Sequence, residues 1–320
     1  MGLAATARTA APVAHTRRIE LPEGMTVERL FASVVAACLQ GIAAERRSLA
    51  QAYDANSLHR MRVGLRRLRT ALGLFRDVLT LPPSLRRELD WLTATLGQAR
   101  DWDVLNESIL PVLGAAAPDA CAALACALQE MLAAQHAAVC AAVGSLRYAR
   151  LMRGLQRCLQ ARCWRAGMKA SQRRRLNASA LKFAQRMLAR YRGRLRRRGK
   201  CWRKANPAAR HLLRIAVKKL RYAYEFFLPL YGAKKTSKRA GKKRARYLAA
   251  LSALQDELGR LNDAAVAGRL LAELQGGRAS PAGCASVLRG YLAARLAHAD
   301  KPVRKRWRKF WQMPAPDCGR

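Results

Sequence analysis

A basic helical pattern occurs twice in this chain, and each copy begins with a histidine. The first copy, at residues 59–75, reads HRMRVGLRRLRTALGLF, and the second, at residues 211–227, reads HLLRIAVKKLRYAYEFF. The histidine, most of the basic positions and several apolar positions coincide. A match of this length within one chain is unlike chance composition, so it indicates an internal duplication. A duplicated basic helix also limits the folds to those that can present two such helices.

A second pair of matching segments, one after each copy, supports the duplication. Leu96-Gly97 with Asp101 matches Leu258-Gly259 with Asp263. The two Leu-Gly segments lie farther apart in the chain than the two basic motifs do, which indicates an insertion in the second half. The basic segment 232–242, GAKKTSKRAGK, is predicted to be this insertion and to form a loop.

Each copy places its basic residues on one face of a helix. At about 100° per residue, His59, Arg62, Arg66 and Arg69 share a face about 80° wide. Like charges at helical spacing repel, so these residues need an anion. Arginine offers a fork of donors that matches phosphate oxygens, and lysine adds a compact charge. The candidate binding residues are His59, Arg62, Arg66, Arg67 and Arg69 in the first copy and His211, Arg214, Lys218, Lys219 and Arg221 in the second.

The alternative is a solvated basic face, or one paired with carboxylates of another helix. The 61 Lys and Arg residues far outnumber the 20 Asp and Glu residues, so many bases have no internal partner. Glu225 is the only acid in the sequence between Arg173 and Arg246. A net charge of +41 strongly attracts polyanions. The composition therefore favours a polyanionic partner.

The roles of the two histidines stay open among four interpretations. In these interpretations the histidines act as metal ligands, as acid–base groups, as hydrogen-bond donors to phosphate oxygens, or as structural residues. Asp101 and Asp263 are expected to support the site by anchoring a basic residue or capping a turn. Tyr222 lies on the second basic face, where contact with phosphate and packing are equally compatible with the sequence.

The nine cysteines show no pattern that indicates a metal site. There is no CxxC pair and no Cys/His group with zinc spacing, and the spacing of Cys158 and Cys163 fits helix packing better than metal binding. We expect no metal and no cofactor. The N-terminus lacks a long apolar core, and no uninterrupted apolar run reaches about 18 residues. The expected protein is cytoplasmic and has no membrane partner.

Almost the whole chain is predicted to be helical, because Ala, Leu and Arg dominate it. Ser57, Ser84 and Asp119 are expected helix N-caps, a helix is expected to restart at Ser145, and Pro207 is expected in a first turn. The predicted fold is all-α, with two four-helix bundles that are related by a pseudo-two-fold duplication around a basic groove or pore. The expected divisions are an N-terminal tail at 1–20, a first half at 21–165, a second half at 173–300 and a basic, aromatic tail at 301–320. That tail either stacks on bases or docks on the body.

The paired motifs resemble the CHAD domain, the conserved-histidine α-helical domain. HRMRVGLRRLR, LGQARDWDV, HLLRIAVKKLRYAYEFF and LQDELGRLND all fit its pattern, and the resemblance covers roughly residues 22–305. It implies two helical bundles with basic residues facing a central groove or pore. It also implies binding of inorganic polyphosphate and recruitment to polyphosphate granules. Some relatives carry an attached triphosphate-tunnel domain, and for this chain we expect a stand-alone module.

Two other functions remain as alternatives to polyphosphate binding. Non-specific nucleic-acid binding fits the charge, although no zinc finger, RRM or KH signature is present. An enzyme acting on polyphosphate or nucleotides normally needs carboxylates for metal ions or a Gly-rich phosphate loop. Neither feature lies on the basic faces, so we expect a binding protein without catalytic activity.

Overall fold

The computed structural model describes residues 24–115, 117–200, 207–231, 238–275, 284–297 and 300–316. Within these ranges the chain is helical and contains no β-strand, only one isolated bridge between Thr26 and Ser179. The predicted all-α class is confirmed. The predicted tail at 1–20 lies outside the described residues.

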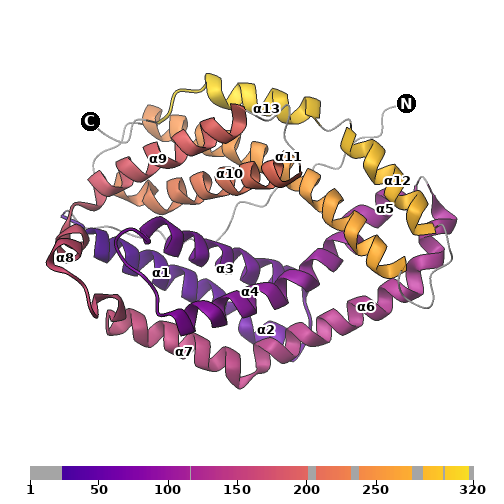
Figure 1. Ribbon diagram of the computed structural model, residues 1–320, viewed down its shortest axis with the longest axis horizontal. Helices are drawn as coiled ribbons and strands as arrows, with labels where there is room; N and C mark the ends of the chain where they lie inside the picture. The colour runs from indigo at the N-terminus through magenta and orange to yellow at the C-terminus, as the bar shows by residue number, and fades with distance from the viewer. Residues whose placement is uncertain are drawn as a thin grey trace.

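The helices follow one another with short connections (Figure 1). Those of the first half are α1 Val27–Ala44, α2 Arg46–Gln51, α3 Ala55–Phe75, α4 Pro83–Val104, the π-helix η1 Leu105–Ile109, α5 Leu110–Gly114, α6 Pro118–Gly144 and α7 Leu146–Gln160. The 3-10 turn η2 Cys163–Arg165 and α8 Ala170–Asn177 come next. Those of the second half are α9 Ala180–Lys200, α10 Pro207–Phe227, the 3-10 turn η4 Leu228–Tyr231, α11 Lys238–Gln275, α12 Cys284–Ala297 and α13 Asp300–Gln312.

Helix starts agree only partly with the expected N-caps. Ser145 caps α7 by accepting a hydrogen bond from the Tyr148 amide, at the point where the sequence predicts that a helix restarts. The predicted cap at Ser57 is wrong, because Asp54 accepts hydrogen bonds from the Asn56 and Ser57 amides and α3 begins at Ala55. Prolines also start helices ahead of two other expected caps, with Pro83 preceding Ser84 and Pro118 preceding Asp119.

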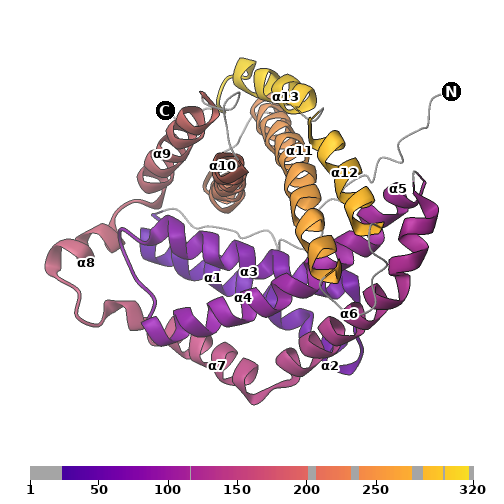
Figure 2. The same cartoon turned by 45° about the vertical axis from the view of Figure 1, so that its right-hand side comes forward.

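Two groups of helices pack against each other (Figures 1 and 2). The first group contains α1, α3, α4 and α7, and the second contains α9, α10, α11 and α13. Helix α3 contacts α10, and α4 contacts α11, so the two basic motif helices meet at the boundary between the groups. Helix α6 lies along the outside and contacts α2, α4 and α12.

The hydrophobic core does not divide at the boundary between the sequence halves. One cluster runs from Val27 in α1 through Phe75 in α3 to Phe227 in α10 and Phe310 in α13. A smaller cluster joins the end of α4, η1 and α6 to the end of α11 and α12. Both clusters therefore contain residues from both halves, and packing of the core holds α3 and α10 in fixed positions.

The segment 301–320, set apart in the sequence as a tail, contributes helix α13 to the second group. Phe310 is 1% exposed and packs on Tyr247 of α11. The Trp307 ring lies against Gly199 of α9, where an added Cβ would meet the ring at 1.8 Å. Of the two interpretations for this segment, docking on the body is the one that the structure shows.

The predicted loop at 232–242 is partly helical. Residues 238–242 form the first turn of α11, which begins five residues earlier than the expected start near 243. Residues 232–237 lie outside the described residues, so the expectation of a loop rests on sequence alone there.

Cys158 and Cys163 form a disulfide where α7 ends and η2 begins. The sequence favoured a packing role for both residues, because their spacing suits neighbouring helical turns. The chain reverses at Arg162, which has a left-handed φ of 50°, and this reversal brings the two cysteines together. Cys38, by contrast, is a buried free thiol, as expected for a small apolar residue.

Two helical stretches, Val27–Gln51 and Pro118–Gly144, are long and apolar enough to cross a membrane. The criterion concerns length and composition only, and core helices of soluble proteins satisfy it too. Half of the apolar window in the first stretch and 28% of that in the second are buried in the protein. The absence of a membrane partner stays a prediction.

Candidate anion-binding site

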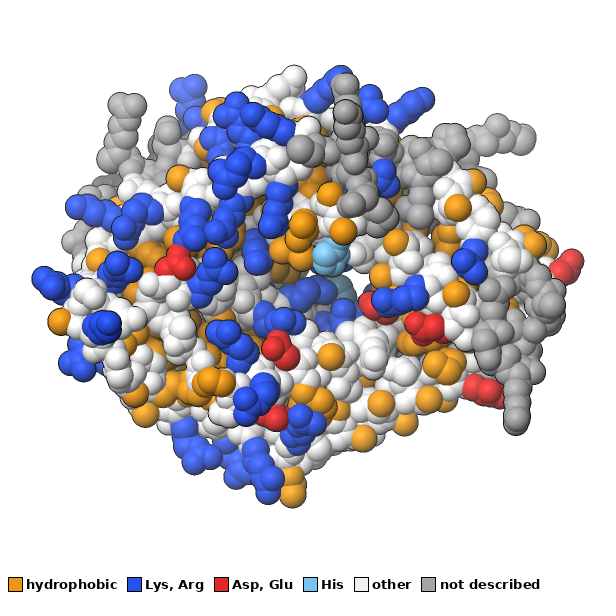
Figure 3. Space-filling model, in the orientation of Figure 1, with side chains coloured by type: hydrophobic (Ala, Val, Ile, Leu, Met, Phe, Trp, Pro, Cys, Tyr) orange, Lys and Arg blue, Asp and Glu red, His pale blue; other side chains and the backbone are white. Residues whose placement is uncertain are grey.

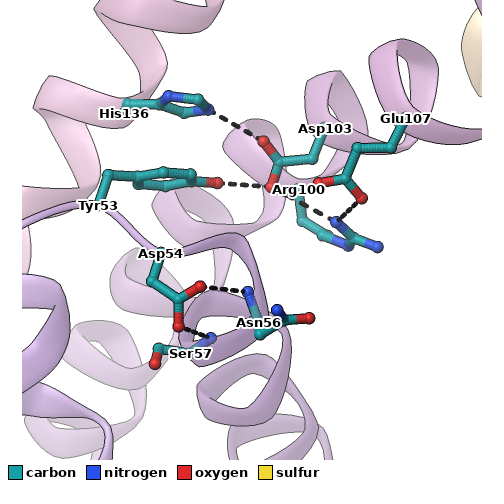
Figure 4. Close-up of polar contacts among 8 residues, drawn as sticks. All are labelled: Tyr53, Asp54, Asn56, Ser57, Arg100, Asp103, Glu107 and His136. Atoms are coloured by element: carbon teal, nitrogen blue, oxygen red, sulfur yellow. Dashed lines mark hydrogen bonds and ion pairs between the residues drawn. The ribbon is translucent and has the colours of Figure 1, made fainter.

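A buried polar network fixes the start of α3 beside α4 and α6 (Figure 4). The hydroxyl of Tyr53 donates a hydrogen bond to Asp103 in α4, and Nε2 of His136 in α6 lies 3.0 Å from the same carboxylate. The Tyr53 ring stacks on His136 with 3.5 Å between ring centroids. Asp103 is 3% exposed, so its charge needs these partners. Asp54 then caps the helix, which sets the position of the basic face of α3. We call the basic faces of α3 and α10 the first and the second stripe.

Helix α4 allows the first stripe to approach closely. A Cβ added at Gly97 would lie 3.0 Å from a terminal guanidinium nitrogen of Arg62. A larger side chain at this position would therefore press on the guanidinium. The glycine at position 97 thus has a steric reason, whereas no atom lies within 4 Å of a Cβ built at the matching Gly259.

Four basic side chains from α3 and α10 converge where the two helices meet. Arg62 and Arg66 come from α3, and Arg214 and Lys218 come from α10. Arg66 is close enough to Arg214 and Lys218 to lower the pKa of each. All four side chains are half-buried. We call these four residues the central cluster. It joins the two predicted stripes.

The two repeated aspartates lie beside the central cluster. Asp263 of α11 is 3.9 Å from Arg214, and Asp101 of α4 lowers the cost of charging Arg62. The protein buries Asp101, which raises the pKa of its carboxyl despite nearby arginines. Both aspartates therefore stand beside basic residues, in the supporting position that the sequence indicates.

The face drawn in Figure 3 is hollowed near its centre. Lys and Arg side chains line the hollow, and a histidine lies at its rim. More Lys and Arg side chains cover the surface on the left of the hollow. The molecule therefore has a concave basic surface, which a convex or chain-like anion fits.

Several donors of the central cluster have no acceptor within the protein. The Nε atoms of Arg62, Arg66 and Arg214 are buried and have no hydrogen-bond partner among the described residues. A buried donor without an acceptor costs about 1–3 kcal/mol. An external acceptor, such as a phosphate oxygen, would remove this cost. The arrangement is thus suited to a ligand with many oxygen acceptors.

Burial and mutual repulsion disfavour the charged forms of the cluster. Burial, together with Arg214 and Arg66, lowers the pKa of Lys218 to about 7. Burial also lowers the pKa of Arg62 to about 10, with Arg66 adding to the effect. Without an anion, Lys218 is therefore only partly charged near neutral pH.

The two histidines stand at the start of the stripes in unlike surroundings. His59 is exposed at the surface, but the surrounding protein removes part of the hydration of its ring. This desolvation and the charges of Arg66 and Arg100 lower the pKa of His59 to about 4. The Nδ1 atom of His211 lies 3.4 Å from the Asn262 side-chain oxygen. Among the described residues, no three His, Cys, Asp or Glu side chains form a group that could hold a metal.

Three of the candidate residues form a separate cluster with Glu225. Arg67 of α3 forms an ion pair with Glu225 of α10, and Arg221 bonds the same carboxylate at 2.5 Å and Gln255 at 2.9 Å. Tyr222 is 2% exposed, and both guanidinium groups lie over its ring. These side chains tie α3 to α10, and an internal carboxylate already offsets part of the charge of the two arginines, so their role in anion binding stays a prediction.

Arg69 and Lys219, the remaining candidates, lie away from the central cluster. Arg69 pairs with Asp90 of α4 at 3.1 Å and is about half exposed. Lys219 is half-buried, and its electrostatic neighbours are Arg198, Arg76 and Arg194. The predicted set of ten residues is thus divided into the central cluster with its histidines, the Glu225 cluster and this second basic area.

Sequence reasoning missed two residues that bear on the site. Arg100 has no counterpart in the second copy, yet it lowers the pKa of His59 and pairs with Glu107 at 3.1 Å. Glu225 was noted only as an isolated acid. The rarity of an acid in so basic a stretch is a signal, since a single carboxylate there has many bases to bind.

Replacing Glu225 with glutamine is expected to destabilise the fold while leaving anion binding in place. The change leaves Arg67 and Arg221 close together without a counter-charge. Because all three side chains are less than a quarter exposed, we expect a loss of about 1–3 kcal/mol in the free energy of unfolding, measured by urea denaturation. Glu88→Gln, which breaks an exposed pair with Arg147, serves as the control and should change stability little. Equal stability of both variants would contradict a structural role for Glu225.

The fold and this site define a class: an all-helical protein in which basic residues from two contacting helices converge. A model of the CHAD domain matches residues 33–272, three quarters of the chain. The chain belongs to the CHAD domain family.

Solved structures agree with this assignment. The crystal structure of the CHAD domain from the plant Ricinus communis is similar with 33% sequence identity and a TM-score of 0.80, covering 96% of this chain and 99% of that one. PptA from Streptomyces chartreusis shares the fold, with 18% identity and a TM-score of 0.65 over 90% of this chain and all of that one. No curated protein matches the chain.

Proposed function

We propose that the protein binds inorganic polyphosphate in the central hollow. The observation that carries the proposal is the convergence of Arg62, Arg66, Arg214 and Lys218, three of which hold buried Nε donors without a protein acceptor. A linear polyanion supplies closely spaced oxygen acceptors and negative charge along its whole length. The resemblance to polyphosphate-binding CHAD domains supports the same ligand.

Polyphosphate fits the site better than nucleic acid does. Binding of single strands commonly relies on aromatic side chains that stack on bases. Tyr222 is buried beside two arginines, and Trp307 and Trp311 pack in the interface of α13. The aromatic residues that the sequence offered for stacking are therefore engaged in packing. Nucleic acid remains the alternative ligand.

The protein acts as a binding module without catalysis in this proposal. Asp101 and Asp263 stand beside arginines, which suits an anchoring role. Incubation with polyphosphate and Mg²⁺, followed by measurement of released phosphate, tests this part. We further propose a cytoplasmic protein that binds polyphosphate granules, and two bundles related by a pseudo-two-fold duplication. Fluorescent tagging in cells that accumulate polyphosphate tests the location.

Binding of long-chain polyphosphate should depend steeply on salt and should resist competition by nucleic acid. Neutralising about four phosphates releases condensed counterions, so log affinity against log salt should fall with a slope steeper than about −2. At equal phosphate concentration, DNA and RNA should displace little of the bound polyphosphate. A flat salt response, or displacement by DNA at parity, would refute the proposed ligand.

A further inference from the structure

The two sequence copies differ at one position where a carboxylate decides the local charge. Glu225 forms ion pairs with both Arg67 and Arg221 and offsets one of their two positive charges. In the alignment of the copies, Arg67 corresponds to Lys219, Arg221 to Arg69, and Glu225 to Gly73. The copy at 59–75 therefore has no acid at the position that corresponds to Glu225.

The surroundings of Lys219 contain more bases than acids. Its pKa is lowered by burial and then by four arginines, with Arg198 and Arg194 from α9 and Arg76 and Arg69 from the end of α3 and just beyond it. Lys219 itself has no carboxylate within 4 Å among the residues that the structure describes.

Two acids reach this area from its margins. Asp90 pairs with Arg69, and Asp77 is shared between Arg76 and Arg190. Both aspartates are about half exposed, so solvent weakens their effect. Together they leave the area around Lys219 with an excess of positive charge.

The position of Gly73 leaves space for an anion beside these bases. A Cβ built at Gly73 meets no atom within 4 Å. A glutamate there would stand four residues after Arg69, as Glu225 stands four residues after Arg221, and such pairs attract on a helix. The protein thus fills one of two corresponding places with its own carboxylate and keeps the other open.

We propose that the place beside Gly73 is a second anion site, in which Lys219, Arg69 and the α9 arginines bind a phosphate group of the same polyphosphate chain that enters the hollow. The inference rests on the proposed function and extends it to a longer ligand path. Lys219 follows Lys218 directly, and Arg69 follows Arg66 by three residues, about 4.5 Å along the axis. Both residues therefore lie within about one helical turn of the central cluster along their helix axes, although their side chains have other neighbours.

Gly73→Glu and Gly73→Gln form a matched pair that tests the site. The glutamate supplies an internal carboxylate that competes with phosphate, whereas the glutamine has the same size without the charge. In titrations with long-chain polyphosphate at fixed salt, Gly73→Glu should bind about tenfold more weakly than wild type, and Gly73→Gln should match wild type. Both variants should fold, because each replaces a helical glycine with a better helix former in open space.

A double variant separates local charge from a general effect. If the glutamate acts through Lys219, adding Lys219→Gln should shrink the loss caused by Gly73→Glu. Equal binding by the glutamate and glutamine variants, whether both like wild type or both weakened, would overturn the second site while leaving the proposed function intact. If wild type fails to bind polyphosphate, the proposed function itself fails and this extension fails with it.

Discussion

Replacing Arg62 and Arg66 with glutamine is expected to weaken polyphosphate binding by at least about 30-fold. Each lost charge-assisted contact in a half-buried position costs about 1–3 kcal/mol, so the pair loses about 2 kcal/mol or more. Arg214→Gln with Lys218→Gln should have a comparable effect, because the two pairs face each other in the central cluster. Titration calorimetry with long-chain polyphosphate measures both losses.

A change of the same net charge elsewhere provides the control. Arg150 and Arg153 lie exposed on α7. Their double replacement with glutamine removes two charges from the overall field and should reduce affinity only a few-fold. The free energy of unfolding should not fall in the central variants, since the changes relieve repulsion among like charges. A large loss in only one of the two central pairs would rule out a shared site.

Helical periodicity predicted the central cluster because the decisive residues lie on one turn-to-turn line. Arg62 and Arg66 are four residues apart, as are Arg214 and Lys218, so the 3.6-residue repeat alone puts each pair on one face. The all-α class followed from composition. The meeting of the two faces depended on packing between α3 and α10, which the duplication and the family resemblance suggested.

Periodicity could not separate residues that bind the ligand from residues that hold the helices together. Arg67 lies beside the stripe in sequence, yet its carboxylate partner is 158 residues away. No local pattern reports such a contact. Helix α13 was missed for a related reason, because a basic, aromatic segment identifies its apolar side only once α9 and α11 lie under it.

The structure also changes which residue should make binding depend on pH. Histidine is the side chain that ordinarily titrates near neutral pH, so the sequence alone suggests His59 and His211 for this role. In the structure, burial and the nearby charges of Arg214 and Arg66 lower the pKa of Lys218 to about 7, within the physiological range. The pKa of His59 is about 4, so its ring is neutral at pH 6–8 in the free protein. Lys218 is therefore expected to contribute more than His59 to the pH dependence of binding.

Polyphosphate affinity should rise about tenfold as pH falls from 8 to 6. A bound polyanion favours the charged amine and raises the pKa of Lys218 towards its ordinary value, so binding takes up a proton. The stability of the ligand-free protein is expected to change with pH in the opposite direction. Because folding lowers this pKa, its stability should decrease as pH falls from about 10.5 towards 7, and ligand should restore it.

Lys218→Arg is the variant that isolates this effect, since arginine keeps the charge but does not titrate in this range. Its affinity at pH 6 should match wild type, and its affinity at pH 8 should be higher, which flattens the profile. Long chains are required, because terminal phosphates with a second pKa near about 6 lose charge on acidification and would oppose the trend. Replacing both histidines with glutamine should leave most of the slope between pH 8 and 7. If the histidine variant is flat and Lys218→Arg is not, the histidines carry the proton, as the sequence suggested, and Lys218 is not the group that titrates on binding.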